Sequence, residues 1–109
     1  LFKAYLHLKE SGYKIIGWGG HPSTKNTFGN VPEDPVYGEC LIRNRVSLAW
    51  NDYLEKKCKE NDIPFVSIIR ELINVDGITN MDYYFDYCHL KTEKTLPIVL
   101  EKLKTQGLI

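Results

Sequence analysis

The stretch Pro64-Phe65-Val66-Ser67-Ile68-Ile69 is apolar at every position except Ser67. A strand with one solvated face alternates between apolar and polar residues, whereas a short continuous apolar run is typical of a parallel strand covered on both faces. We therefore predict a buried strand at residues 64–69. Parallel strands of this kind belong to α/β proteins, so this stretch sets the expected fold class.

The segment before this strand predicts the longest helix of the chain. Between Gly38 and Glu60 an apolar residue recurs every three or four positions, and charged residues fill the other face. The stripe that we expect to pack on the core consists of Ile42, Val46, Ala49, Trp50, Tyr53 and Leu54. Trp50 and Tyr53 are then core residues, and a sugar-stacking set formed with Trp18 is the less favoured alternative.

Two further elements open the chain. Residues 2–9 have apolar side chains at helical spacing and lead into Ser11-Gly12, where glycine can adopt the left-handed conformation that ends a helix. Residues 13–18 are β-branched in the middle and run into Gly19-Gly20, which indicates a strand followed by a loop. Prolines and asparagines then predict a long loop from His21 to Tyr37.

After the central strand, residues 70–87 are irregular and a last helix follows. Its apolar stripe is Leu96, Val99, Leu100 and Leu103. Because Pro97 lacks an N–H, we place the start of the helix close to Lys94 or Thr95, where amides of the first turn are unpaired. The order helix, strand, helix, strand, helix implies a right-handed crossover between parallel strands.

This order predicts a three-layer, flavodoxin-like α/β domain to which the chain contributes the last two strands and three helices. Two strands alone would leave a sheet edge uncovered. Residues 1–109 are therefore expected to form the carboxy-terminal part of one larger domain, or to complete their sheet with another copy. The first residue is Leu1 rather than Met, as in a processed, trimmed or fragmentary chain.

The composition excludes several classes of partner. Lys plus Arg and Asp plus Glu number 14 each, so the net charge is zero and gives no electrostatic reason to bind nucleic acid or an anionic membrane surface. The apolar runs are far shorter than the ~20 residues that span a bilayer. Cys40, Cys58 and Cys88 include no C-x-x-C pair, which favours reduced cysteines that pack in the protein. The compartment stays open, with the cytoplasm favoured.

The five residues Asp86-Tyr87-Cys88-His89-Leu90 stand just before the last helix. They resemble the final conserved block, D-x-x-H-L, of the SGNH or GDSL-type serine esterases. That family also has an arginine near the start of a long helix, an asparagine followed about three residues later by leucine, and a strand of the type I-P-F-V-D. The residues in these places are Arg43 or Arg45, Asn51, Leu54 and 63–67. The resemblance covers most of the chain, although only D-x-x-H-L is specific.

The resemblance implies a serine esterase or acyl hydrolase that acts on a small acyl ester, with an acetylated carbohydrate as the expected substrate and no cofactor or metal. The family's serine, glycine and G-x-N-D blocks have no counterpart in these residues. The nucleophile is therefore expected in the missing amino-terminal half. Ser23, Ser47 and Ser67 fall in a loop, a helix and a strand, none of which predicts the tight strand-to-helix turn that exposes a reactive hydroxyl.

The chemistry of such a site explains the spacing of its two residues. An imidazole can take a proton from a serine hydroxyl at neutral pH and return it to the leaving alcohol, which makes His89 the candidate general base. A carboxylate bound to the other ring nitrogen fixes the tautomer and stabilises the imidazolium. Asp86, three residues earlier, can fold back across one turn to do this.

Ligands in open α/β sheets bind beyond the carboxyl ends of the strands. Gly20 and His21 directly follow one predicted strand, and the approach to Asp86 follows the other. We therefore expect Gly20 and His21 to take part in substrate binding. The loop from His21 to Tyr37 would form part of the rim around the substrate.

Each of these residues also has a simpler interpretation. Asp86 can be a turn or capping residue, with His89 as an ordinary partly buried imidazole, and the chain is then a non-catalytic α/β module for interaction or oligomerisation. His21, in a glycine-proline turn, can be a surface residue. A metal site built from His21, Cys88 and His89 lacks a recognisable ligand spacing. Cys88 is expected to be an apolar filler that points away from His89.

Overall fold

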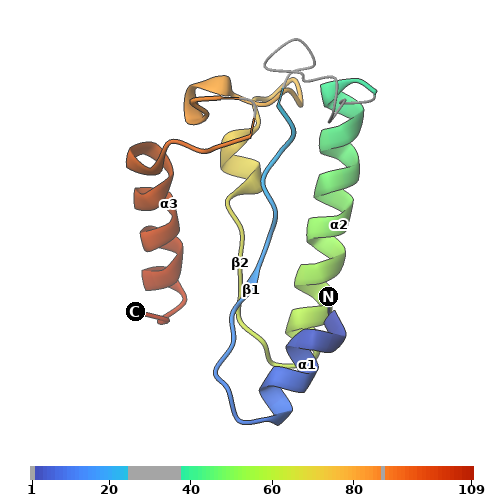
Figure 1. Cartoon of the computed structure of the whole chain (residues 1–109), viewed down its shortest axis with the longest axis vertical. Helices are drawn as coiled ribbons and strands as arrows, with labels where there is room; N and C mark the ends of the chain where they lie inside the picture. The colour runs from blue at the N-terminus through green and yellow to red at the C-terminus, as the bar shows by residue number, and fades with distance from the viewer. Residues whose placement is uncertain (1, 25–37, 87) are drawn as a thin grey trace.

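The computed structural model describes residues 2–24, 38–86 and 88–109. Within these ranges the helices are α1 (Phe2–Glu10), α2 (Cys40–Glu60) and α3 (Thr92–Thr105), and the strands are β1 (Gly17–Trp18) and β2 (Phe65–Val66) (Figure 1). The strands are parallel, with Gly17 paired to Phe65 and Trp18 to Val66. The described part of the chain is thus a mixed α/β structure with a two-stranded parallel sheet, which confirms the predicted fold class.

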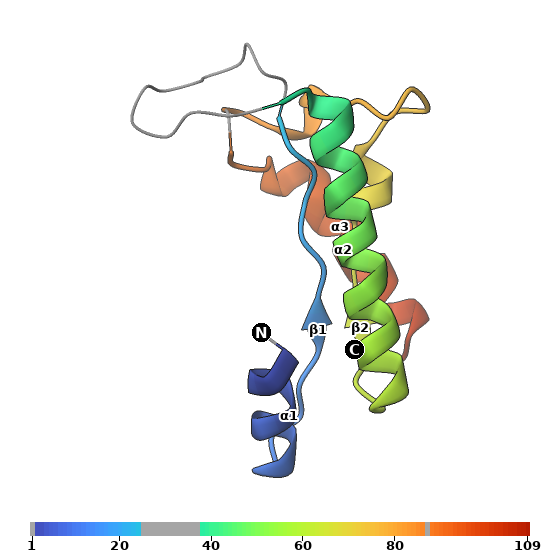
Figure 2. The same cartoon turned by 90° about the vertical axis from the view of Figure 1, so that its right-hand side faces the viewer.

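Helices α2 and α3 lie on opposite sides of the strands, as two views at right angles show (Figures 1 and 2). Helix α2 contacts both strands, and α3 contacts β2. Because the strands run in the same direction, their carboxyl ends point to one end of the molecule, where the segment between β2 and α3 also lies (Figure 1). Helix α1 lies at the other end.

The ladder is shorter than the apolar runs predicted for it. Pairing ends at the hydrogen bond from Gly19 N to Val66 O, which is 2.8 Å long. Beyond this point the chain bends into a 3-10 turn at Ile69–Leu72, whose Ile69 amide is accepted by the hydroxyl oxygen of Ser67. Ile68, Ile69 and Leu72 are nevertheless buried. The apolar run therefore correctly indicated burial, but it overestimated the length of the strand.

The apolar core includes a cluster at the end of the molecule away from the carboxyl ends of the strands. Leu54, Cys58 and Ile63 are buried there, and the partly buried residues packed against them are Phe2, Tyr5, Leu6, Ile15 and Phe65. The cluster joins α1 to the second half of α2 and to the start of β2. It anchors the amino-terminal ends of the strands.

The predicted core stripe of α2 is wrong except at Leu54, which is buried. Ile42, Val46, Trp50 and Tyr53 are exposed, with 51% of the side-chain surface of both Trp50 and Tyr53 open to solvent. The face that packs on the sheet carries Cys40, Asn44, Asn51, Leu54 and Cys58. Two asparagines can occupy this face because their side-chain amides form hydrogen bonds with other polar groups of the fold. Those partners are distant in sequence, so helical periodicity alone does not indicate them.

Helix α3 begins at Thr92, two residues before the earliest predicted start. Pro97 consequently lies inside the helix rather than in its first turn. Because proline has no N–H, this interior position leaves one helix carbonyl without its usual intrahelical partner. The turn around Lys91 carries the start instead, because Lys91 O accepts both the amide and the hydroxyl of Thr95. Leu96 and Leu100, half of the predicted stripe, are exposed.

Cys40, Cys58 and Cys88 form no disulfide, and Cys40 and Cys58 are buried as predicted. Cys88 is only partly buried. No helix in the described ranges combines the length and the apolar character needed to cross a membrane.

Candidate active site

The segment between β2 and α3 lies at the carboxyl ends of the strands (Figure 1), and its residues 84–90 form a closed loop. Tyr84 and Leu90 form an isolated antiparallel bridge, and Phe85 N donates to His89 O at 3.1 Å. These two contacts bring the ends of the loop together. Asp86, Cys88 and His89 are thereby held at its tip.

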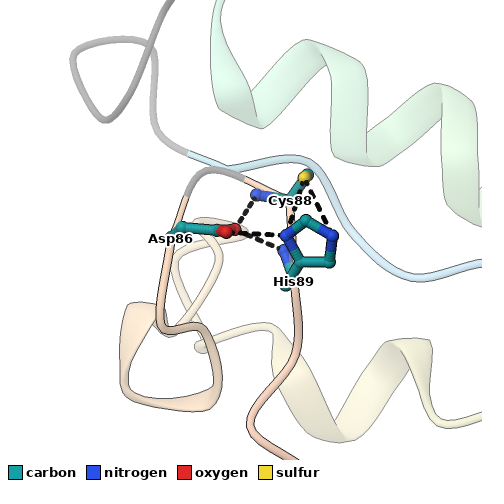
Figure 3. Close-up of polar contacts among 3 residues, drawn as sticks. All are labelled: Asp86, Cys88 and His89. Carbon is teal, nitrogen blue, oxygen red and sulfur yellow. Dashed lines mark hydrogen bonds and ion pairs between the residues drawn. The ribbon is translucent and has the colours of Figure 1, made fainter.

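Asp86 and His89 form the predicted carboxylate and imidazole pair (Figure 3). Oδ2 of Asp86 lies 2.6 Å from Nδ1 of His89. The other carboxylate oxygen, Oδ1, accepts the backbone amides of Cys88 at 2.8 Å and of His89 at 2.6 Å. One carboxylate thus fixes both the backbone of the loop and the direction of the ring, which places the second ring nitrogen, Nε2, away from the carboxylate.

The hydrogen bonds also keep the carboxylate charged. The backbone N–H of Cys88 is the main reason that the pKa of Asp86 falls from 3.8 to about 2. Partial burial opposes this shift, and the amide and ring of His89 support it. Asp86 is therefore an anion at any pH at which an imidazole base would work.

The His89 ring is both accessible and oriented. Its side chain is 64% exposed. It stacks on Phe85 with 5.6 Å between ring centroids and 15° between the ring planes. Stacking limits rotation of the ring while leaving its edge open to solvent, as a general base requires.

The prediction that Cys88 points away from His89 is wrong. Cys88 Sγ lies 3.2 Å from Nδ1 and 3.9 Å from Nε2 of His89 (Figure 3). The physical reason is the carboxylate of Asp86, which accepts both neighbouring amides and so curls a loop that was expected to be extended. Cys88 is part of the site rather than an apolar filler.

His21 follows β1 and reaches the same segment through Tyr84. The buried hydroxyl of Tyr84 donates to Pro22 O at 2.6 Å, so its oxygen accepts from His21 Nδ1 at 3.0 Å. Burial also raises the pKa of Tyr84, which keeps the phenol protonated. His21 Nδ1 must then carry a proton in the neutral ring. Its Nε2 keeps a lone pair that can accept a hydrogen bond.

The close approach of backbone to side chain occurs at Gly19, the neighbour of the Gly20 that we expect to contact substrate. A Cβ at Gly19 would overlap Asn51 Oδ1 and Ser67 Oγ, whereas a Cβ at Gly20 would meet nothing within 4 Å. The hydroxyl of Ser67 donates to Asn51 Oδ1 at 2.7 Å directly beneath Gly19. This contact locks β1, β2 and α2 together at the carboxyl edge.

A second buried polar contact, which the sequence did not reveal, supports the same edge. Asn44 accepts the amide of Ser23 at 2.9 Å and donates to Gly77 O at 2.9 Å and Thr79 Oγ1 at 3.0 Å. Asn44 and Asn51 are seven residues apart on α2, so they lie on one face of the helix. That spacing is the sequence signal that could have identified the polar face.

The remaining predicted site features lie elsewhere. Most of the expected substrate rim, residues 25–37, is outside the described residues. Trp50 stacks on Tyr53 with 5.7 Å between ring centroids, on the exposed face of α2. The hydroxyl of Ser67 donates to Asn51 Oδ1 and is therefore engaged within the fold.

A cleft of 520 Å³ lies between α2, β2 and α3, but the residues that line it do not include Asp86 or His89. Ion pairs between Arg70 and Asp52, and between Lys102 and Glu71, border it. These pairs join four of the charged side chains that line the cleft. The cleft is therefore separate from the candidate acid and base.

No protein-family model, curated protein or solved structure matches this chain.

Proposed function

We propose that this chain carries the acid and base of a serine esterase or acyl hydrolase of the SGNH or GDSL type, acting on a small acyl ester such as an acetylated carbohydrate. The observation that carries the proposal is the 2.6 Å contact between Asp86 Oδ2 and His89 Nδ1, formed in a loop at the carboxyl ends of parallel strands. A turn residue with no catalytic role needs only the amide contacts of Asp86. The orientation of the ring is the additional feature that catalysis requires.

In this mechanism the Nδ1–H of His89 donates a hydrogen bond to Asp86 Oδ2, so Nε2 holds the lone pair. Nε2 removes the proton of the serine hydroxyl as the oxygen attacks the acyl carbonyl. The resulting imidazolium is stabilised by Asp86, which the low pKa keeps ionised, and then returns the proton to the leaving alcohol. A second round with water as the nucleophile releases the acid and restores the serine.

The serine and the donors that stabilise the oxyanion belong to the part of a three-layer, flavodoxin-like domain that would pair with β1. The N–H groups of Gly17 and Gly19 point to β2, so by alternation those of Ile16 and Trp18 face the other way. An additional strand there would place its own carboxyl end beside the loop of Asp86 and His89. Gly20 and the lone pair on His21 Nε2 would contact the substrate from the same edge.

The test uses the polypeptide that joins this chain to the serine, with p-nitrophenyl acetate as substrate. His89→Ala should lower turnover by a factor of roughly 10³ or more, because only the base is removed. His7→Ala, on the exposed surface of α1 at the other end of the molecule, is the matched control and should leave turnover unchanged.

Two results would contradict the proposal. One is a folded His89→Ala variant that turns over ester at the normal rate. The other is an active polypeptide in which a serine-directed phosphonate labels no serine. The isolated chain of 109 residues should be inactive, since its Asp86 and His89 have no serine partner.

The second candidate function is a non-catalytic interaction or oligomerisation module. The apolar residues on the exposed face of α2 favour it, because contiguous apolar surface commonly marks a binding surface. A module of this kind would need neither the charge of Asp86 nor the ring of His89. Partner binding that survives both Asp86→Asn and His89→Ala, in a polypeptide without esterase activity, would favour this function.

A further inference from the structure

Three side chains of different chemistry meet at the tip of the loop between Tyr84 and Leu90. The carboxylate of Asp86, the thiol of Cys88 and the ring of His89 each offer one ligand atom, and these atoms lie within 4.8 Å of one another (Figure 3). One thiolate sulfur, one imidazole nitrogen and one carboxylate oxygen form a donor set that Zn²⁺ accepts in proteins. Calcium and magnesium, which require oxygen ligands, do not fit it.

The distances within the cluster are close to those of a coordinated ion. Around a tetrahedral zinc ion, sulfur and nitrogen ligands lie about 3.6 Å apart, and oxygen and nitrogen ligands about 3.3 Å apart, given the usual metal-ligand bond lengths. Cys88 Sγ lies 3.2 Å from His89 Nδ1, and Asp86 Oδ2 lies 2.6 Å from the same atom. Small side-chain rotations therefore suffice to admit an ion.

The loop holds these ligands in place without the ion. Asp86 uses Oδ1 for the amides of Cys88 and His89, which leaves Oδ2 for a metal. The ring of His89 is stacked on Phe85, and the Phe85 amide donates to His89 O across the loop. Ligands that are already positioned lose less conformational entropy on binding, and contacts of this kind commonly tune metal affinity.

We propose that Asp86, Cys88 and His89 form a binding site for a thiophilic divalent ion such as Zn²⁺. The ion binds Asp86 Oδ2, Cys88 Sγ and His89 Nδ1. As the metal-sulfur bond forms, the thiol proton leaves to solvent. The Nδ1 proton of His89 also leaves to solvent while Nε2 takes one up, so the ring stays neutral, and two metal bonds replace the hydrogen bond between Asp86 and His89. The exposed side of His89 leaves a fourth position for water.

Metal binding and base catalysis exclude each other at this site. A neutral imidazole that coordinates through Nδ1 carries its proton on Nε2, so it has no lone pair with which to accept the proton of a serine. Zinc is thus expected to inhibit the proposed esterase. Metal binding itself does not rest on that proposed function, and it can be measured on this chain alone.

The experiment is a titration of the purified, reduced chain with Co²⁺, followed by competition with Zn²⁺. Cobalt should give a thiolate-to-metal charge-transfer band that saturates at one ion per chain and is lost when Zn²⁺ is added. Cys88→Ser should abolish the band. Asp86→Asn and His89→Gln should each weaken binding by about tenfold or more, because each removes one ligand.

Two control variants separate this site from other metal-binding groups of the chain. Cys58→Ala removes a buried thiol, and His7→Gln removes an exposed imidazole outside the loop. Both should bind cobalt as the unmodified chain does. A band that persists in Cys88→Ser, or the absence of any saturable thiolate band, would overturn the proposal. Circular dichroism shows whether each variant is folded, and Asp86→Asn is chosen because its amide oxygen can still accept the two loop amides.

Discussion

Asp86 organises the loop because its carboxylate accepts three hydrogen bonds. Two come from the backbone amides of Cys88 and His89, and the third comes from the ring of His89. The same residue therefore closes the turn, orients the imidazole of His89 and keeps its own charge. A turn residue and a catalytic acid are usually alternative interpretations of such a position, but this geometry is compatible with both.

The pKa of Asp86 distinguishes the contributions of backbone and ring. We expect a carboxyl pKa of about 2, below the ordinary 3.8, measured by carbon NMR on the labelled chain. In His89→Gln the pKa should rise only part of the way, because the main cause, the Cys88 amide, is retained. Since the folded-state pKa is lowered, the stability that Asp86 contributes is fully present above pH 3.8 and is lost as the pH falls through about 2. An Asp86 that titrates at its ordinary value in the unmodified chain would contradict the geometry of the loop.

Helix α2 shows how an element can turn a polar face to the interior. Its buried asparagines, Asn44 and Asn51, meet groups from the loops after β1 and β2. Because a buried amide left without partners costs roughly 1–3 kcal/mol, such a face is stable only when every partner is in place. The helix is therefore oriented by its hydrogen bonds at the carboxyl edge and by apolar contacts of Leu54 and Cys58 at the other end.

Two neighbouring glycines provide a matched test of this packing. Gly19→Ala should destabilise the chain by about 1–3 kcal/mol, since the added methyl group overlaps Asn51 Oδ1 and Ser67 Oγ. Gly20→Ala should change the free energy of unfolding by no more than about 0.5 kcal/mol, because its methyl group enters open space. Urea unfolding of both variants measures the difference. Equal effects would show that Gly19 is not held against α2 as described.

The two edges of the sheet differ in how they are protected. At β2, the carbonyl of Phe65 points away from β1 and accepts the side chain of Gln106 at 2.9 Å, so the end of α3 covers this edge. At β1, the backbone groups of Ile16 and Trp18 face away from β2, and 45% of each side chain is exposed. An open strand edge with apolar side chains is prone to pair with another strand.

The isolated chain should therefore self-associate through β1, in a concentration-dependent way that light scattering or sedimentation can detect. Trp18→Lys should shift the chain towards the monomer, because a charged side chain on an edge strand disfavours pairing. Val75→Lys replaces a fully exposed apolar residue outside both strands and should leave the association unchanged. A chain that stays monomeric at all concentrations, or that responds equally to both substitutions, would contradict this role for β1.

Local sequence determined the order of the elements and the identity of the pair at the site. The apolar run around Phe65 and Val66 indicated a buried parallel strand, and the spacing of Asp86 and His89 indicated that one turn brings the carboxylate back to the imidazole. Both predictions depend on neighbouring residues alone. For that reason they could be made without the fold, and the structure has the strand and the contact between the two side chains.

Tertiary structure decided which face of each helix is buried and which side chains join the site. Asn44 and Asn51 face the sheet because Ser23, Thr79 and Ser67, distant in sequence, supply their hydrogen-bond partners. Trp50 is exposed because it lies on the opposite face of α2, which points outward when the asparagine face packs on the sheet. Periodicity identifies a face but not its partner, since a polar side chain is favourable inside a protein only when the fold brings another polar group to meet it.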